Sequence, residues 1–175
     1  MGKTVFIILS QFLLIYLQLE LGNLGWPLPL ALMGALYTAL ALGGNWGIGA
    51  ALLSGSLLCA LYGGGFNALL VIIHPLLAGL LCWWIERHDE DVRPDFFIPG
   101  IWAGIAGTLP AFFSLTYYAL AEGRVPGDWL FFLLRMLWSI AVSGGIFTMF
   151  IFIGEACTEF MGLPRFLTRK GGHKR

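Results

Sequence analysis

Residues 86–95 read ERHDEDVRPD, and this short stretch holds seven of the twenty Asp, Glu, Lys and Arg residues of the chain. The sequence on either side is almost entirely apolar until a basic tail begins at Arg165. One charge at the centre of a bilayer costs roughly 2.5–3.5 kcal/mol on insertion scales, so this stretch cannot cross hydrocarbon. We therefore predict a loop in water, with the rest of the chain folded around it inside a membrane.

The composition also indicates a membrane protein. Hydrophobic residues fill 58% of the 175 positions and charged residues only 11%, whereas soluble domains are about a quarter charged. The formal net charge is zero, which offers no electrostatic footprint for nucleic acid. By length the chain forms one domain, which we assign to residues 1–164, followed by a basic cytoplasmic tail over residues 165–175.

Apolar segments separated by polar or glycine-rich turns predict an all-α integral membrane protein with six transmembrane helices. The predicted spans are residues 4–19, 28–42, 47–62, 68–85, 96–121 and 129–154. Residues 28–62 cannot form one span, because their length at about 1.5 Å per residue reaches roughly 50 Å, against a hydrocarbon core of about 30 Å. We interpret the first segment as an uncleaved span, because no small-x-small cleavage site follows it.

The distribution of basic residues predicts the orientation. With six spans, the N-terminus, residues 86–95 and the tail share one side, and that side carries eight of the ten Lys and Arg residues. The opposite side carries only Arg124, and Arg135 lies within the sixth segment. Because cytoplasmic loops hold the excess of basic residues, we expect both termini in the cytoplasm of a bacterial inner membrane.

Small residues recur at helical spacing in the second and fifth segments. Such stripes let membrane helices approach one another closely. We therefore treat them as candidate partner-binding positions, although the sequence leaves open which stripe meets a partner and which packs internally. The positions are Ala31, Ala35, Ala39, Gly100, Gly104 and Gly107.

Few polar side chains fall inside the apolar segments. Arg135 is either a charge that faces a partner or a cavity, or a residue that snorkels to the outer interface. His74, which precedes Pro75, is either structural or part of a ligand or proton site. Glu155 and Glu159 lie four residues apart, and we expect them to mark the cytoplasmic end of the sixth span beside the basic tail.

The chain lacks the motifs of common enzymes. No GxSxG, HExxH, HxE…CxxC or GxxxxGK[ST] pattern occurs. Cys59, Cys82 and Cys157 lie in apolar runs without a CxxC pair, so we interpret them as small buried side chains rather than metal ligands. We therefore expect no catalytic residue, no cofactor and no metal.

Residues 27–87 contain a characteristic order of features. A proline and an apolar segment precede the turn GGNWGIG at 43–49, a small-residue segment and a glycine turn at 63–67 follow, and WWIER ends the region at 83–87. This order resembles the MreD family of rod shape-determining proteins, as do the length, the six-span layout and the basic tail. The family often carries an acid before the second glycine turn, where residues 59–62 read CALY here, so no site is transferred from that position.

The resemblance implies a non-enzymatic scaffold of the cell-wall elongation complex, which acts in peptidoglycan synthesis and cell shape. The expected partners are the transmembrane helix of an MreC-like protein, the complex of RodA with its penicillin-binding transpeptidase and, indirectly, an MreB-type filament. The MreD fold is similar to the substrate-binding S components of energy-coupling-factor vitamin transporters, and such an S component is the alternative function. S components dock through an Ala-x-x-x-Ala stripe in their first span, whereas residues 4–19 contain no alanine.

Overall fold

The computed structural model describes residues 2–87, 97–123, 129–164 and 166, and these residues are almost entirely helical. The helices, in chain order, are α1 (Gly2–Asn23), α2 (Leu30–Leu42), α3 (Gly44–Leu61), the short 3₁₀ helix η1 (Gly65–Ala68), α4 (Leu69–Arg87), α5 (Phe97–Glu122) and α6 (Trp129–Phe160). The part of the chain that the structure describes contains no strand. Most of the predicted charged loop, and the basic residues of the tail, lie outside the described residues.

Five of these helices are long and apolar enough to cross a membrane: α1, α3, α4 together with η1, α5 and α6. The sixth helix, α2, has 13 residues and measures only about 20 Å, less than the roughly 30 Å of a hydrocarbon core. The chain is therefore a helical protein with the character of a multi-pass membrane protein. Six complete spans and cytoplasmic termini remain predictions.

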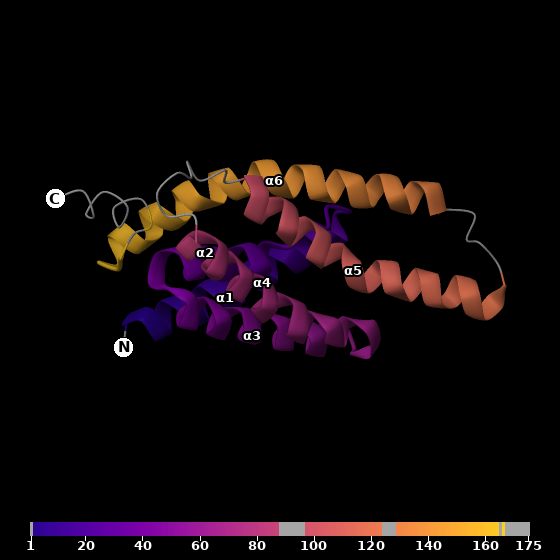
Figure 1. The fold of residues 1–175 in the computed structure, drawn as a ribbon, viewed down its shortest axis with the longest axis horizontal. Coiled ribbons are helices and arrows are strands. Elements are labelled where there is room, and N and C mark those ends of the chain that lie inside the picture. Colours follow the sequence, from indigo (N-terminus) through magenta and orange to yellow (C-terminus); the bar gives the residue numbers. More distant parts are fainter. Residues whose placement is uncertain (1, 88–96, 124–128, 165, 167–175) are drawn as a thin grey trace.

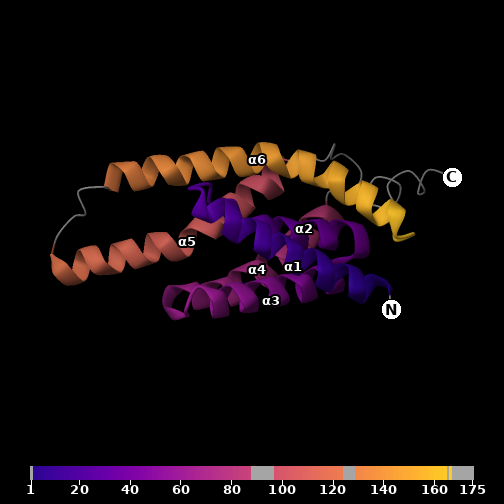
Figure 2. The same cartoon turned by 180° about the vertical axis from the view of Figure 1, so that it is seen from behind.

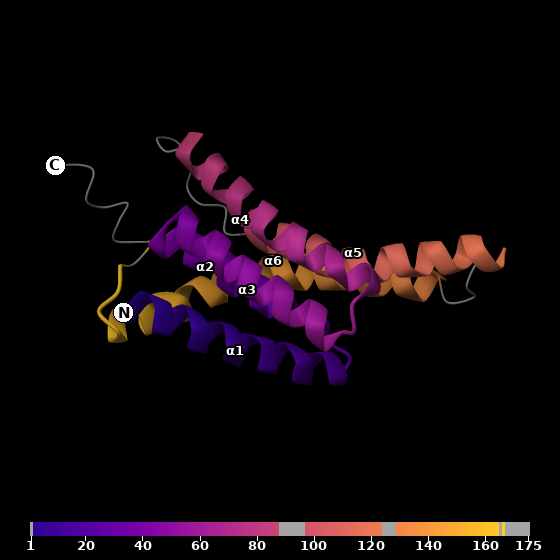
Figure 3. The ribbon, with the colours of Figure 1, turned by 90° about the horizontal axis from the view of Figure 1, so that it is seen from below.

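The short helix α2 is the centre of the fold, because every one of its residues is buried and it contacts all five other α-helices. Helices α1, α3 and α4 lie side by side against one side of it (Figure 3), while α5 and α6 cover the other (Figure 1). A helix that is apolar on all faces is expected in the interior of a bundle. The sequence LALMGALYTALAL of α2 fits that position.

Successive helices run in opposite directions, which brings both described ends of the chain to one end of the bundle (Figure 1). A Cβ atom added to Gly2 would lie 3.9 Å from Leu163 Cδ2. The ammonium group of Lys3 lies 5.8 Å from the ring centroid of Trp46 at the start of α3. We call this the N-terminal end of the bundle. The C-terminal part of α4 also lies there, because a Cβ atom on Gly44, at the start of α3, would lie 3.3 Å from Cys82 Sγ. Arg87 ends α4 shortly after Cys82.

The helix α6 continues to Phe160, beyond the predicted end of the sixth span at residue 154. Its end is a Schellman motif, in which Leu163 N donates to Thr158 O at 2.8 Å and Gly162 N donates to Glu159 O at 3.0 Å. Gly162 adopts φ +64°, a conformation that glycine reaches without steric cost. The helix therefore stops at a glycine, and the acid at position 155 does not interrupt it.

Candidate functional site

The alanine stripe of α2 lies inside the bundle. Ala31 and Ala35 are completely buried and Ala39 is 4% exposed. Gly47 of α3 packs directly on Ala39, since a Cβ atom on Gly47 would come 2.5 Å from Ala39 Cα. The stripe thus lets α3 approach α2, and a partner helix could reach it only by displacing helices of this chain.

Two of the three glycines of the α5 stripe, Gly100 and Gly104, are buried against α6, whereas Gly107 is exposed. A Cβ atom on Gly100 would lie 2.5 Å from Ser143 O, and one on Gly104 would lie 2.8 Å from Ile140 Cα. Gly107 faces the segment before α2 instead, where its Cβ atom would lie 2.9 Å from Pro29 Cβ. Helix α6, which follows α5 in the chain, therefore packs against the face of α5 that carries Gly100 and Gly104. The chain's own helices therefore cover the alanine stripe and the Gly100 and Gly104 positions, and partner binding at these stripes stays a prediction.

Arg135 is exposed and lies near the beginning of α6. One turn further along, Ser139 Oγ donates to Pro27 O at 2.8 Å, so at that level α6 lies beside the segment between α1 and α2. The α5–α6 hairpin extends beyond the ends of α3 and α4 (Figure 2). This position fits a guanidinium that reaches the outer interface, and a role for Arg135 in partner binding stays a prediction.

His74 forms a buried bond between helices. It is 1% exposed, and its Nδ1 lies 2.9 Å from Ser54 Oγ of α3. Since Ser54 Oγ donates to Ala51 O at 3.0 Å, His74 Nδ1–H is assigned as the donor to Ser54. The pair is a structural contact between α3 and α4.

Replacing Ser54 with alanine is expected to lower the free energy of unfolding by about 0.6 kcal/mol, the average for hydrogen bonds between membrane helices. The buried imidazole then lacks this acceptor. The change is measured by thermal unfolding in detergent, with Ser56→Ala on the exposed side of α3 as the matched control. Equal stability of the two variants would contradict a structural role for the pair.

A buried polar cluster joins α2 to the last turns of α6. Tyr37 OH donates to Glu155 Oε1 at 3.1 Å and lies 3.0 Å from Thr158 Oγ1. Phe166 N also donates to Glu155 Oε1, at 2.8 Å. Gly154 permits this contact, because a Cβ atom there would lie 2.7 Å from the ring of Tyr37. The cluster fastens the end of α6 and the segment beyond it to the central helix.

Glu155 and Glu159, which we expect to mark the cytoplasmic end of the sixth span, differ in burial. Glu155 is 8% exposed and belongs to the interior, whereas Glu159, one turn later, is exposed. The cysteines also differ from expectation: Cys59 and Cys82 are only partly buried, and Cys157 is exposed.

Two glutamines of α1 that the sequence analysis did not single out bind the backbone of α2. Gln18 Oε1 accepts a hydrogen bond from Ala31 N at 3.0 Å, which satisfies a donor in the first turn of α2. Gln11 is completely buried, and with its amide nitrogen toward Ala31 O (3.1 Å) its oxygen accepts from Ala35 N (3.2 Å). A spacing of seven residues places both amide side chains on one face of α1, and this spacing was the feature of the sequence that could have indicated a polar contact with another helix.

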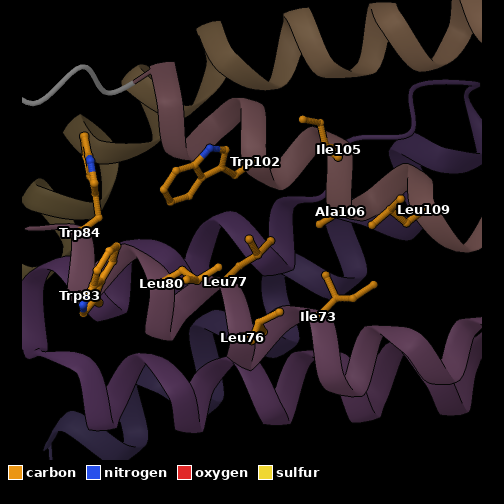
Figure 4. Close-up of a pocket in the computed structure, with 10 residues that line it drawn as sticks. All are labelled: Ile73, Leu76, Leu77, Leu80, Trp83, Trp84, Trp102, Ile105, Ala106 and Leu109. Carbon is orange, nitrogen blue, oxygen red and sulfur yellow. The ribbon is translucent and has the colours of Figure 1, made fainter.

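An open groove of about 490 Å³ runs between α4 and α5 (Figure 4). Its wall is apolar throughout. Trp84 and Trp102 meet edge to face at one end, with ring centroids 6.0 Å apart. The lining residues are Ile73, Leu76, Leu77, Leu80, Trp83, Trp84, Trp102, Ile105, Ala106 and Leu109.

The outer face of α6 presents a third stripe of small residues. Ala141 and Gly145 are exposed, and a Cβ atom on Gly145 would find no atom of the chain within 4 Å. Other exposed residues, most of them larger, continue the same face in both directions at helical spacing. The face consists of Trp138, Ala141, Gly145, Met149, Phe152 and Ala156.

Among the described residues, no group of three or more His, Cys, Asp or Glu side chains is placed to hold a metal ion. The candidate sites are thus the groove between α4 and α5 and the outer face of α6. Comparisons with protein-family models, with curated proteins and with solved structures find no match for this chain.

Proposed function

We propose that this chain is a non-enzymatic scaffold of the bacterial cell-wall elongation complex, MreD-like in role, which holds the transmembrane helix of an MreC-like partner in the inner membrane. The resemblance of residues 27–87 to the MreD family motivates the proposal. The observation that carries it is the small-residue face of α6, because the alanine stripe and the glycines Gly100 and Gly104 are covered by the chain's own helices while this face is exposed.

The dimensions of this face suit a helix that spans the membrane. From Trp138 to Ala156 it covers about 27 Å along α6, close to the roughly 30 Å of the hydrocarbon core. Trp138 is 63% exposed and lies next to Ser139, which marks the level of the segment between α1 and α2. An aromatic residue at that level suits the membrane interface.

The mechanism is close packing. At Ala141 and Gly145 a second helix can bring its backbone near that of α6, and the dispersion energy of that contact exceeds what mobile lipid tails supply. Arg135 would lie beside the outer end of such a helix. Contacts of RodA, its transpeptidase and an MreB-type filament would then be organised through the partner.

The test is co-purification in detergent from native membranes, followed by mass spectrometry of proteins and retained small molecules. We expect a single-span MreC-like protein at near-equal amount. Gly145→Leu should reduce its recovery by about tenfold, a loss of roughly 1.4 kcal/mol, because the added side chain prevents the close approach at this position. The chain itself should remain intact, since the new side chain meets open space.

Gly49→Leu is the matched control, because Gly49 is also exposed on a membrane helix, α3, and a Cβ atom there meets no neighbour within 4 Å. Equal partner recovery from both variants would refute docking on α6. A retained vitamin, or ATPase subunits in place of the single-span protein, would refute the scaffold and identify a transporter S component.

A further inference from the structure

We propose that the groove between α4 and α5 is a binding site for one phospholipid of the leaflet at the N-terminal end of the bundle, with an acyl chain in the groove and an anionic headgroup beside Arg87. This site is separate from the α6 face and does not depend on the proposed function. It rests on the chemistry of the groove wall, the length of the groove and the cation at its mouth.

The wall of the groove suits a hydrocarbon chain. All ten lining residues are apolar or tryptophan, and Leu77, Leu80 and Trp102 lie in the space between the two helices (Figure 4). Water in such a groove would find no hydrogen-bond partner among these aliphatic side chains. Leu76 and Leu80 are 58% and 43% exposed, so the groove opens sideways, where acyl chains enter from the bilayer.

The length of the groove distinguishes an acyl chain from a helix. Along α4 it extends from Ile73 to Trp84, about 16 Å, which is close to half of a hydrocarbon core of about 30 Å. A partner helix that crosses the bilayer would need a contact along both leaflets, as on α6. A groove confined to about one leaflet matches the depth that a single lipid tail occupies.

The mouth of the groove suits a headgroup. The guanidinium carbon of Arg87 lies 5.2 Å from the ring centroid of Trp83, and Trp83 itself lines the groove. Tryptophan rings favour the interface between headgroups and tails, and an arginine there binds phosphate through paired N–H donors. The positive charge at the apolar groove therefore points to an anionic phospholipid rather than a neutral sterol or fatty alcohol.

The experiment reconstitutes the delipidated full chain in detergent with equal amounts of phosphatidylglycerol and phosphatidylcholine, and counts retained lipids by native mass spectrometry. We expect one phosphatidylglycerol per chain. Arg87→Gln should weaken its retention about fivefold, as expected for one basic residue beside an anionic headgroup. Loss of the preference for phosphatidylglycerol without loss of bound lipid would also support the assignment of Arg87.

Leu80→Trp fills the groove and should abolish retention, whereas Ile72→Trp places the same side chain on α4 outside the groove, at a residue that is 66% exposed. Equal retention in these two variants would overturn the site. A photo-reactive residue at Leu76 in native membranes supplies a second readout that needs no folding assay. A lipid adduct supports the proposal, and a protein adduct would show that a helix occupies the groove and would overturn it.

Discussion

Replacing Gly104 with leucine is expected to separate α5 from α6 and to destabilise the chain itself, rather than only weaken a complex. A Cβ atom at this position would lie 2.8 Å from the Cα atom of Ile140 and 3.1 Å from Ser143 Cβ. The first of these is backbone, which cannot move aside as the end of a flexible side chain can. Overpacking of a close contact costs about 1–3 kcal/mol and occasionally more. We expect the upper part of that range or beyond.

The loss is measured as the midpoint of thermal unfolding in detergent, followed by size-exclusion chromatography. Gly145→Leu is the control, because it adds the same side chain to the same helix pair on the open side of α6. The control should keep the midpoint of the unchanged protein. A Gly104→Leu variant as stable as the Gly145→Leu variant would contradict the close approach of α5 and α6 at this position.

The second large effect is expected from Glu155→Leu. The substitution retains most of the side-chain volume but removes the oxygen that accepts from Tyr37 OH and Phe166 N. A buried donor that loses its acceptor costs about 1–3 kcal/mol. Tyr37 OH keeps its contact with Thr158 Oγ1, so Phe166 N accounts for most of the loss. The segment after α6 should then become sensitive to limited proteolysis.

Two comparisons sharpen this prediction. Glu159→Leu, one turn away and exposed, should change the unfolding midpoint little, because surface charges contribute about 0–1 kcal/mol. Tyr37→Phe combined with Glu155→Leu forms a double-mutant cycle that isolates the bond between the two side chains. Additive effects in that cycle, together with unchanged proteolysis of Glu155→Leu, would contradict the role of the cluster as an anchor for the C-terminal segment.

Much of the helical layout was predictable because the bilayer restricts what an apolar chain can form. The predicted segments agree with six helices to within a few residues at most boundaries. Glycine turns separated α2 from α3 and α3 from α4, as expected. The helix α6 continues past the predicted span end at residue 154, and Glu155 finds its hydrogen-bond donors inside the bundle.

The candidate sites were less predictable. Small-residue spacing predicts that a helix face packs closely, but not whether the neighbour belongs to the same chain. Ala31 and Gly104 have the same pattern around them as Ala141 and Gly145, yet the first two are buried and the last two exposed. The groove between α4 and α5 gives no local signal, because its residues come from two helices and are as apolar as their surroundings.

The sequence alone therefore determined that the chain is helical and built for a membrane, since composition and the spacing of charges control where a polypeptide meets hydrocarbon. Only the tertiary structure decided that α2 is the central helix, that the alanine stripe and the glycines Gly100 and Gly104 serve internal packing, and that Tyr37 meets Glu155 from 118 residues away. These features depend on which helix faces touch. Apolar side chains favour lipid and protein almost equally, so burial within the membrane leaves little trace in the residue pattern.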